Sequence, residues 1–195
     1  EVNSARKVIA LNGSPHKRGN TYHSLKLACD EMNTRGIETE IVQVGGKPLR
    51  GCIDCGHCKN IMDHRCSIAT DEMNDFIIKA IGADGILIGS PVYFANMTPE
   101  TKCLIDRLGR VTRNNGFLLK NKPGAAVVSA RRSGETFTFS AINYLFQASQ
   151  MPIVTSSHWN FMMAEGRNDW ERDEEGLETM KLLGENMAWM LERFA

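Results

Sequence analysis

One stretch of the chain decides the fold, and it reads Val8-Ile9-Ala10-Leu11-Asn12-Gly13-Ser14-Pro15-His16-Lys17-Arg18-Gly19-Asn20-Thr21. Its first four residues form an apolar run that is typical of a buried strand. Residues 22–34 then show a helical pattern. In open α/β sheets, the loop between a first strand and a first helix is suited to phosphate, because the helix N-terminus presents unpaired N–H groups and the positive end of its dipole.

This loop also carries side chains that suit an anion. Donors and positive charges come from Ser14, Lys17, Arg18, Asn20 and Thr21. Gly13 and Gly19 let the backbone approach a ligand closely. The loop is neither a Walker A motif nor a Gly-x-Gly-x-x-Gly motif. Taken alone, it is therefore either a phosphate-binding loop or an ordinary turn between a strand and a helix.

The composition is that of an ordinary globular protein, with 42% hydrophobic and 24% charged residues among 195. This length predicts one domain spanning residues 1–195. The formal net charge of +0 gives no electrostatic support for a nucleic-acid partner. No apolar run approaches the length of a membrane span, and Glu1 to Ala5 lack the apolar core of a signal peptide. We expect a cytoplasmic protein that binds neither nucleic acid nor membrane.

Strand and helix patterns alternate along the chain. Strands are predicted over residues 8–11, 37–44, 85–89, 125–129 and 152–156. Helices are predicted over residues 20–35, 71–81, 98–112, 133–150 and 174–194. This alternation predicts an α/β fold, a three-layer doubly wound sandwich around a five-stranded parallel sheet. The flavodoxin-like strand order 2-1-3-4-5 would place a site at the carboxyl ends of strands one and three.

Two of these helices carry more detailed predictions. Thr98 is expected to cap the helix over residues 98–112, with Pro99 at its first position. The inward-facing residues expected in the helix over residues 133–150 are Phe137, Ala141, Leu145 and Phe146. The acidic run from Glu165 to Glu178 is interpreted as a solvated loop and helix start rather than a binding tail.

Two further loops are expected at the same edge of the sheet as the first. The segment from Ser90 to Thr98 combines apolar and aromatic side chains with Asn96 and backbone amides, a mixture that suits a planar heteroaromatic ring. The segment from Ser129 to Glu135 adds backbone amides and two arginines. Together with the anion loop, they suggest a site for a mononucleotide with a planar ring.

Four cysteines lie within residues 47–70, a segment without helical or strand period. Cys52, Cys55, Cys58 and Cys66 give the spacing C-x2-C-x2-C-x7-C. Three thiolates two residues apart can wrap one corner of a cubane cluster, and a fourth can close it. Structural zinc, a redox dithiol and cysteines that are reduced and empty are the alternatives. The remaining cysteines, Cys29 and Cys103, are expected to be small core residues.

Several blocks in consistent order resemble the signature of the NAD(P)H-dependent FMN reductase family, most closely its iron-sulfur flavoprotein branch. They are Gly13-Ser14-Pro15 with Gly19-Asn20-Thr21, Ser90-Pro91-Val92-Tyr93, and Thr101-Lys102 with Asp106-Arg107. The resemblance implies FMN-phosphate contacts at Ser14, His16, Lys17, Arg18, Asn20 and Thr21. It implies ring contacts at Pro91, Val92, Tyr93, Phe94 and Asn96, and further contacts at Ala130 and Arg131. It also implies a [4Fe-4S] cluster on Cys52, Cys55, Cys58 and Cys66.

The resemblance implies an FMN-dependent oxidoreductase that takes electrons from NADH or NADPH and passes them to a flavin, a quinone or a protein acceptor. An electron carrier that is linked to ferredoxin and lacks NAD(P)H activity is the alternative. A zinc-stabilised binding module is a third. We predict no catalytic acid or base, and Tyr93 is the one side chain to test in that role. Relatives commonly close the shallow flavin site with a second subunit, so a homodimer or homotetramer is expected.

Asp106 and Arg107 also have a reading that involves no chemistry. The two side chains are adjacent in a predicted helix, and we interpret them as an ion pair on the helix surface or at an interface, rather than as catalytic residues.

Overall fold

The computed structural model describes residues 6–193 of the chain, so Glu1 to Ala5 and the predicted helix end at Phe194 lie outside the described residues. A single parallel sheet runs through the described part, with strand order β2-β1-β3-β4-β5. Its strands are β1 (Lys7–Asn12), β2 (Glu38–Gln43), β3 (Gly85–Pro91), β4 (Gly124–Ala130) and β5 (Phe161–Met163). The predicted fold class and strand order are therefore confirmed.

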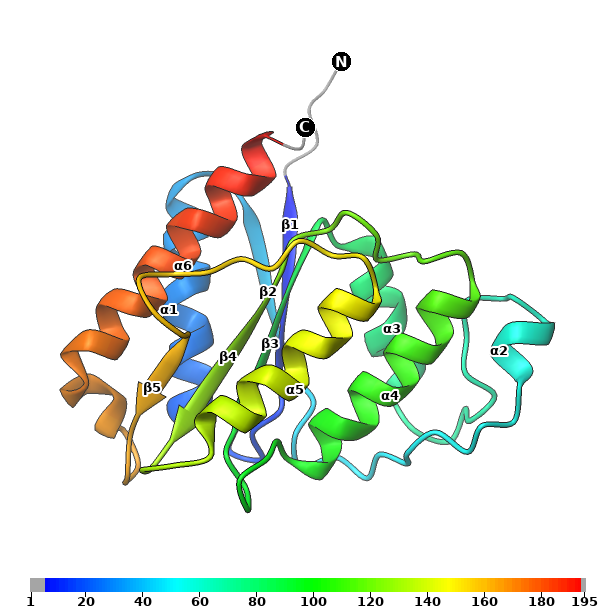
Figure 1. The fold of residues 1–195 in the computed structure, drawn as a ribbon, viewed down its shortest axis with the longest axis horizontal. Helices are drawn as coiled ribbons and strands as arrows, with labels where there is room; N and C mark the ends of the chain where they lie inside the picture. Colours follow the sequence, from blue (N-terminus) through cyan, green and yellow to red (C-terminus); the bar gives the residue numbers. More distant parts are fainter. Residues whose placement is uncertain (1–5, 194–195) are drawn as a thin grey trace.

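Helices cover both faces of this sheet. One face carries α1 and α6, and the opposite face carries α3, α4 and α5 (Figure 1). The helices are α1 (Asn20–Thr34), α2 (His57–Asn60), α3 (Met73–Gly82), α4 (Pro99–Asn114), α5 (Glu135–Ala148) and α6 (Glu174–Arg193), with a short 3-10 helix η1 (Asp169–Arg172). Among residues 6–193, none of the helices combines the length and the apolar character that a membrane span requires.

The side chains of the central strands divide into two cores. Ile9 and Leu11 of β1 point into the core beneath α3, α4 and α5, whereas Val8 and Ala10 point into the core beneath α1 and α6. Successive residues of a strand face opposite sides of the sheet, so a strand buried on both faces must be apolar throughout. This requirement explains the continuous apolar run from Val8 to Leu11.

Two predictions about the fold were wrong. The fifth strand is β5 and not residues 152–156, of which only Ile153 makes an isolated bridge, to Gly124. Pro152 has no N–H to donate, and after this one bridge the chain leaves the sheet and returns to pair with β4. Phe137 was expected to face inward, yet it is 72% exposed. In α5 the buried positions begin at the next residue, Thr138, which lies about 100° further round the helix.

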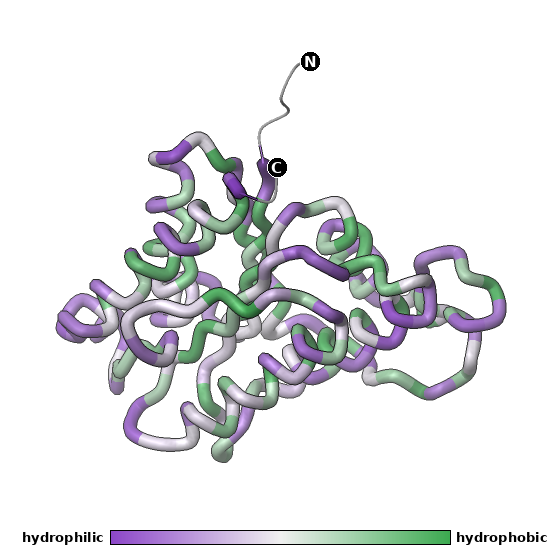
Figure 2. The backbone as a smooth tube through the Cα atoms, turned by 45° about the horizontal axis from the view of Figure 1, so that its top comes forward, coloured by the Kyte–Doolittle hydropathy of each residue, from purple (hydrophilic) through white to green (hydrophobic). Residues whose placement is uncertain are grey.

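The cysteine-containing segment forms a lobe at one side of the molecule, between β2 and α3, and α2 is its only helix (Figure 1). Hydrophobic and hydrophilic stretches alternate along this lobe (Figure 2, right). Ile53, Ile61 and Met62 are at least half exposed there. Apolar burial by the lobe itself is therefore limited, and its attachment to the domain depends on polar contacts.

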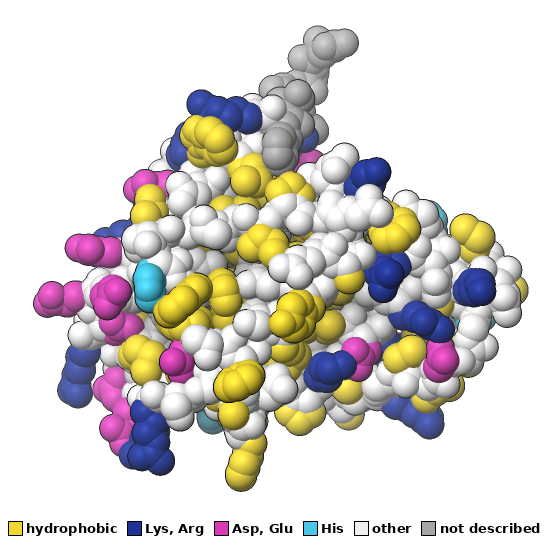
Figure 3. Space-filling view, viewed as in Figure 1, with side chains coloured by type: hydrophobic (Ala, Val, Ile, Leu, Met, Phe, Trp, Pro, Cys, Tyr) yellow, Lys and Arg dark blue, Asp and Glu magenta, His cyan; other side chains and the backbone are white. Residues whose placement is uncertain are grey.

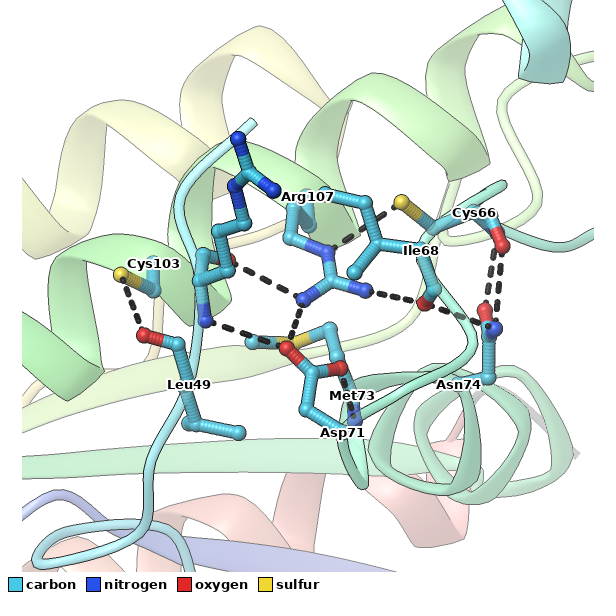
Figure 4. A network of polar contacts seen from close by, with 9 residues as sticks. Leu49, Cys66, Ile68, Asp71, Met73, Asn74, Cys103 and Arg107 are labelled. Carbon is cyan, nitrogen blue, oxygen red and sulfur yellow. Dashed lines mark hydrogen bonds and ion pairs between the residues drawn. The ribbon is translucent and has the colours of Figure 1, made fainter. Parts of the chain in front are cut away.

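The principal polar contact is made by Arg107 of α4, a fully buried side chain (Figure 4). Its Nη1 pairs with Asp71 Oδ2 at 2.5 Å and donates to the carbonyl of Arg50 at 3.0 Å. Its Nη2 donates to the carbonyl of Ile68 at 2.8 Å. Its Nε donates to Cys66 Sγ at 3.2 Å. One guanidinium thus joins four points of the segment from residue 50 to residue 71.

The interpretation of Asp106 and Arg107 as a surface ion pair was wrong for Arg107. Asp106 does lie on the surface, where it pairs with Lys102 one turn earlier in α4. The next residue points about 100° away and therefore into the protein. The charge of Arg107 is tolerated there because Asp71 and three further acceptors surround it.

The same contacts change the acidity of Asp71. Burial by itself would raise the pKa of this carboxyl group, but hydrogen bonds from Arg107 and from the backbone N–H groups of Arg50 and Met73 outweigh it. The pKa of Asp71 is therefore lowered from its ordinary value. A carboxyl group with a lowered pKa in the folded state stabilises the fold while it is ionised, and this contribution disappears as the pH falls through that pKa.

We predict that Asp71→Asn lowers the free energy of unfolding by about 3 kcal/mol at neutral pH, because it leaves the buried Arg107 charge without its counterion. The difference from the wild type should shrink as the pH falls below about 4, because the unfolded wild-type chain takes up a proton at this carboxyl first and the folded chain, in which the pKa of Asp71 is lowered, does so only at more acidic pH. Urea unfolding between neutral and acidic pH measures both effects. Asp106→Asn, at an exposed pair, is the control and should change stability by less than about 1 kcal/mol. A pH-independent difference for Asp71→Asn would contradict the argument.

Candidate functional site

The first candidate site lies at the carboxyl edge of the sheet, where the loops after β1, β3, β4 and β5 come together at the bottom of Figure 1. The loop after β1 is held by backbone contacts. Gly13 N donates to the carbonyl of Gly89 at 2.7 Å, and its own carbonyl accepts the Thr98 hydroxyl at 2.7 Å. A Cβ atom on Gly13 would lie 1.8 Å from Thr101 Oγ1, so only glycine fits this position.

Helix α4 begins as the sequence predicts. Thr98 is its N-cap, with the side-chain oxygen accepting from Thr101 N at 3.3 Å, and Pro99 is its first residue. The same hydroxyl group donates a hydrogen bond to the carbonyl of Gly13, so the start of α4 fixes the position of the loop after β1. Thr98 and Thr101 are both fully buried.

Ser14 follows as a nearly buried residue at the base of the loop. Its backbone N–H donates to Asn12 Oδ1 at 3.1 Å, and its hydroxyl oxygen accepts from His16 N at 3.2 Å. Gln43 of β2 donates to the carbonyl of Ser14 at 2.6 Å. This arrangement orients the loop toward the N-terminus of α1, whose N-cap is Gly19 and whose first N–H groups receive no side-chain cap.

A pocket of about 650 Å³ opens in front of this loop. It is lined on one side by Pro15, His16, Lys17, Arg18, Gly19 and Asn20, and on the other by Glu165, Gly166 and Arg167. Three side chains in the lining carry permanent positive charge, and they are Lys17, Arg18 and Arg167. Thr21 does not line it, because its side chain is buried against β3 beneath the loop.

Asn20 joins the two sides of the pocket. Its amide nitrogen donates to the carbonyl of Gly166 at 2.9 Å. Its amide oxygen is buried and has no hydrogen-bond partner. A buried acceptor of this kind is matched by a donor in most proteins, so a ligand with hydroxyl groups fits here.

The far wall of the pocket is a feature that the sequence did not reveal. Residues 165–167 belong to the acidic run that was interpreted as a solvated loop, and no motif marks them. The segment reaches the pocket because Trp170 of η1 stacks on His23 of α1, with ring centroids 4.4 Å apart and planes inclined by 10°. Burial lowers the pKa of His23, so its ring is uncharged near neutral pH.

The loop after β3 forms a tight hairpin that projects from the same edge (Figure 1). Tyr93 and Asn96 pair through two backbone hydrogen bonds of 2.7 and 3.1 Å, and Phe94 and Ala95 at its tip have positive φ. Hydrophobic side chains stand out from this edge in Figure 3. Phe94 is fully exposed and Tyr93 is 43% exposed.

The ring contacts that were predicted after β3 therefore lie on one hairpin, some at its base and some near its tip. Pro91 and Val92 are half-buried at its base, where Val92 N donates to the carbonyl of Ser129 at 2.9 Å. Tyr93, Phe94 and Asn96 are exposed toward its tip. Ala130, the last residue of β4, is buried, and Arg131 in the loop that follows forms an ion pair with Glu165 of the pocket wall. The roles of these residues toward a ring stay predictions.

The second candidate site lies in the lobe, at a small hollow that is partly open to solvent. All four cysteines of the C-x2-C-x2-C-x7-C pattern line it, together with Arg107 and Arg110 of α4. Gly56, with φ of 76°, makes the turn from which α2 begins, and this turn brings Cys58 back toward α4. Cys58 is buried, Cys66 is half-buried, and Cys52 and Cys55 are exposed.

Each of the four sulfur atoms has a polar neighbour at hydrogen-bond distance. Asp54 N donates to Cys52 Sγ at 3.4 Å, and Ser67 Oγ lies 3.1 Å from Cys55 Sγ. The side-chain amide of Asn114 donates to Cys58 Sγ at 3.3 Å, and Arg107 Nε donates to Cys66 Sγ at 3.2 Å. The contact with Ser67 and the backbone N–H of His57 lower the pKa of the Cys55 thiol.

This donor set fits a group that is bound by four thiolates. Thiolates carry negative charge, and hydrogen bonds to sulfur with a nearby cation stabilise them. Within residues 6–193, no three His, Cys, Asp or Glu side chains are gathered closely enough to hold a single metal ion. All four cysteines nevertheless line the same small hollow.

Comparison with known proteins identifies the family of the chain. The family model described as NADPH-dependent FMN reductase matches residues 6–166. An iron-sulfur flavoprotein of Methanocaldococcus jannaschii is 35% identical over 189 residues, covering 93% of this chain and 95% of that protein. An iron-sulfur flavoprotein of Methanosarcina thermophila is 31% identical, covering 95% of each chain.

Solved structures show the same fold at lower identity. The structure of RosB with a bound 8-demethyl-8-formylriboflavin-5'-phosphate intermediate has a TM-score of 0.78 at 17% identity, and the match covers 97% of this chain and 80% of that one. A flavodoxin from the domain Archaea has a TM-score of 0.62 at 15% identity, with 95% and 99% covered. From the family match and the two relatives, we conclude that the chain belongs to the NADPH-dependent FMN reductase family of flavoprotein oxidoreductases, beside its iron-sulfur flavoproteins.

Proposed function

We propose that this protein is an FMN-dependent oxidoreductase that transfers electrons from NADH or NADPH to a flavin, quinone or protein acceptor and carries a [4Fe-4S] cluster in its cysteine lobe. The observation that carries the flavin half is the cationic pocket of about 650 Å³ in front of the glycine loop. The observation that carries the cluster half is the hollow lined by four cysteines, each with a polar neighbour at its sulfur.

The chain's own groups suit the phosphate of FMN. Lys17 and Arg18 would neutralise its charge, and the first N–H groups of α1 would donate to its oxygens. The unpartnered amide oxygen of Asn20 would accept from a hydroxyl group of the ribityl chain. Thr98 would keep the loop in place through its hydrogen bond to Gly13. These residues bind and orient, and none of them transfers a proton.

The ring would lie beside the hairpin after β3, with Pro91 and Val92 against it and Tyr93 near its face. When bound, FMN supplies hydride and single-electron chemistry, and a cluster supplies single-electron transfer. The protein's contribution would be the placement of the ring, the exclusion of water by the apolar hairpin, and the charge of Arg131 near the pocket. Cys52, Cys55, Cys58 and Cys66 would hold the cluster.

The alternative is an electron carrier that is linked to ferredoxin and does not react with NAD(P)H. Its support is the similarity to iron-sulfur flavoproteins, whose names specify no nucleotide substrate. The two candidates share the flavin and the cluster and differ only in the electron donor.

The choice of donor gives the first prediction. Anaerobic mixing of the FMN-loaded protein with NADH or NADPH in a stopped-flow instrument should bleach the flavin absorbance within seconds. If ferredoxin or dithionite reduces the flavin but neither NADH nor NADPH does, the proposed NAD(P)H-dependent activity is wrong and the electron-carrier alternative holds. If the protein binds no FMN at all, both the oxidoreductase and the electron-carrier proposals are wrong.

The phosphate contact gives the second prediction. Arg18→Gln should weaken FMN binding about tenfold, because one charge-assisted hydrogen bond of about 1.5 kcal/mol is lost. Binding of riboflavin, which has no phosphate, should stay the same, and flavin fluorescence measures both. Lys26→Gln, which removes a cation two turns further along α1, is the matched control and should bind like the wild type. An equal loss for riboflavin would show a collapsed loop rather than a lost phosphate contact.

The cysteine set gives the third prediction. Changing any one of Cys52, Cys55, Cys58 or Cys66 to serine should lower the iron content of anaerobically purified protein, whereas FMN should be retained. Cys103→Ser is the control, because Cys103 is a half-buried cysteine on α4 that does not line the hollow. Zinc in place of iron, or full iron content in the serine variants, would contradict the proposed cluster.

A further inference from the structure

Two of the four sulfur contacts come from a single helix. Arg107 and Asn114 lie seven residues apart on α4 and thus on the same helix face. Arg107 Nε donates to Cys66 Sγ at 3.2 Å, and Asn114 Nδ2 donates to Cys58 Sγ at 3.3 Å. The other two contacts, to Cys52 and Cys55, come from the lobe itself and are exposed. The buried half of the cysteine set is therefore held by α4.

Arg107 is held in place by further contacts, and the chain next to Asn114 is held as well. The remaining nitrogen atoms of Arg107 are bound to Asp71 and to the carbonyl groups of Arg50 and Ile68 (Figure 4). Asn114 occupies the last position of α4, and the next residue, Asn115, donates to the carbonyl of Cys58 at 3.0 Å. Cys58 is thus tied to this end of the helix through its sulfur and its backbone.

Donors in these positions have a predictable effect on a cluster. A cluster gains negative charge when it is reduced, and hydrogen bonds to its sulfur ligands stabilise the reduced state more than the oxidised state. The effect is larger for contacts that are shielded from water. Arg107 is fully buried, and its contacts in Figure 4 hold its Nε–H toward Cys66.

We propose that Arg107 and Asn114 are positioning residues that fix Cys66 and Cys58 and raise the reduction potential of the cluster, an inference that rests on the proposed function. Asp71 has a supporting role, because it compensates the guanidinium charge and leaves the hydrogen bond to sulfur as the main influence of Arg107. Arg110 and Arg113, on the same helix, make no hydrogen bond to a cysteine sulfur through their side chains.

The test compares variants that remove a donor without removing a cysteine. Asn114→Ala removes one donor at a partly exposed position, where the helix should persist. Arg107→Lys keeps a positive charge opposite Asp71 but lacks the Nε–H group that reaches Cys66. Arg113→Met is the control, because it removes a charge from α4 whose side chain lies over Phe117 instead. Each protein is reconstituted anaerobically with ferrous iron and sulfide, and the cluster is titrated with dithionite under EPR observation.

Asn114→Ala and Arg107→Lys should each lower the ratio of reduced to oxidised cluster at a fixed potential about tenfold, which equals about 59 mV for one electron. Arg113→Met should titrate like the wild type. Unchanged potentials in both donor variants, or an equal shift in the control, would overturn the inference while the proposed cluster stands. A wild-type protein that takes up no iron would overturn the inference together with the proposed cluster.

Discussion

The lobe depends on one buried charge. A guanidinium in an apolar interior is unfavourable unless it is compensated, and Arg107 is compensated only when residues 50, 66, 68 and 71 are all in place around it. Folding of the lobe and burial of this side chain therefore require each other. Three of those partners are backbone or sulfur atoms of the cysteine segment, so the charge fixes the path of the chain that carries the cysteines.

Helix α4 connects this lobe with the rest of the molecule. At its start, the Thr98 hydroxyl holds the carbonyl of Gly13 in the glycine loop, and at its end Asn114 reaches the sulfur of Cys58. A rigid helix thus sets the relative placement of the loop and the hollow. The sheet contributes the remaining constraint, because parallel strands bring the loops after β1, β3 and β4 to one edge.

Much of the fold followed from local patterns. Apolar runs and helical periods predicted four of the five strands, the doubly wound topology that their alternation indicates predicted the strand order, and Thr98-Pro99 predicted the start of α4. The errors share a cause. Residues 152–156 have the composition of a strand, but whether they form one depends on their pairing partner in the sheet. Phe137 is large and apolar, but its burial depends on the rotation of α5 about its axis. Composition reveals neither the pairing partner nor the rotation.

The sequence by itself determined the residue types at both sites: a glycine loop with donors and cations, an aromatic hairpin, and four cysteines at close spacing. Only the tertiary structure decided that Arg107 is buried against Asp71, that residues 165–167 close the pocket, and that two donors on α4 reach the cysteine sulfurs. The reason is physical. Local patterns record which residues prefer to be buried, whereas the partner of a buried polar group comes from a distant part of the chain and is set by packing.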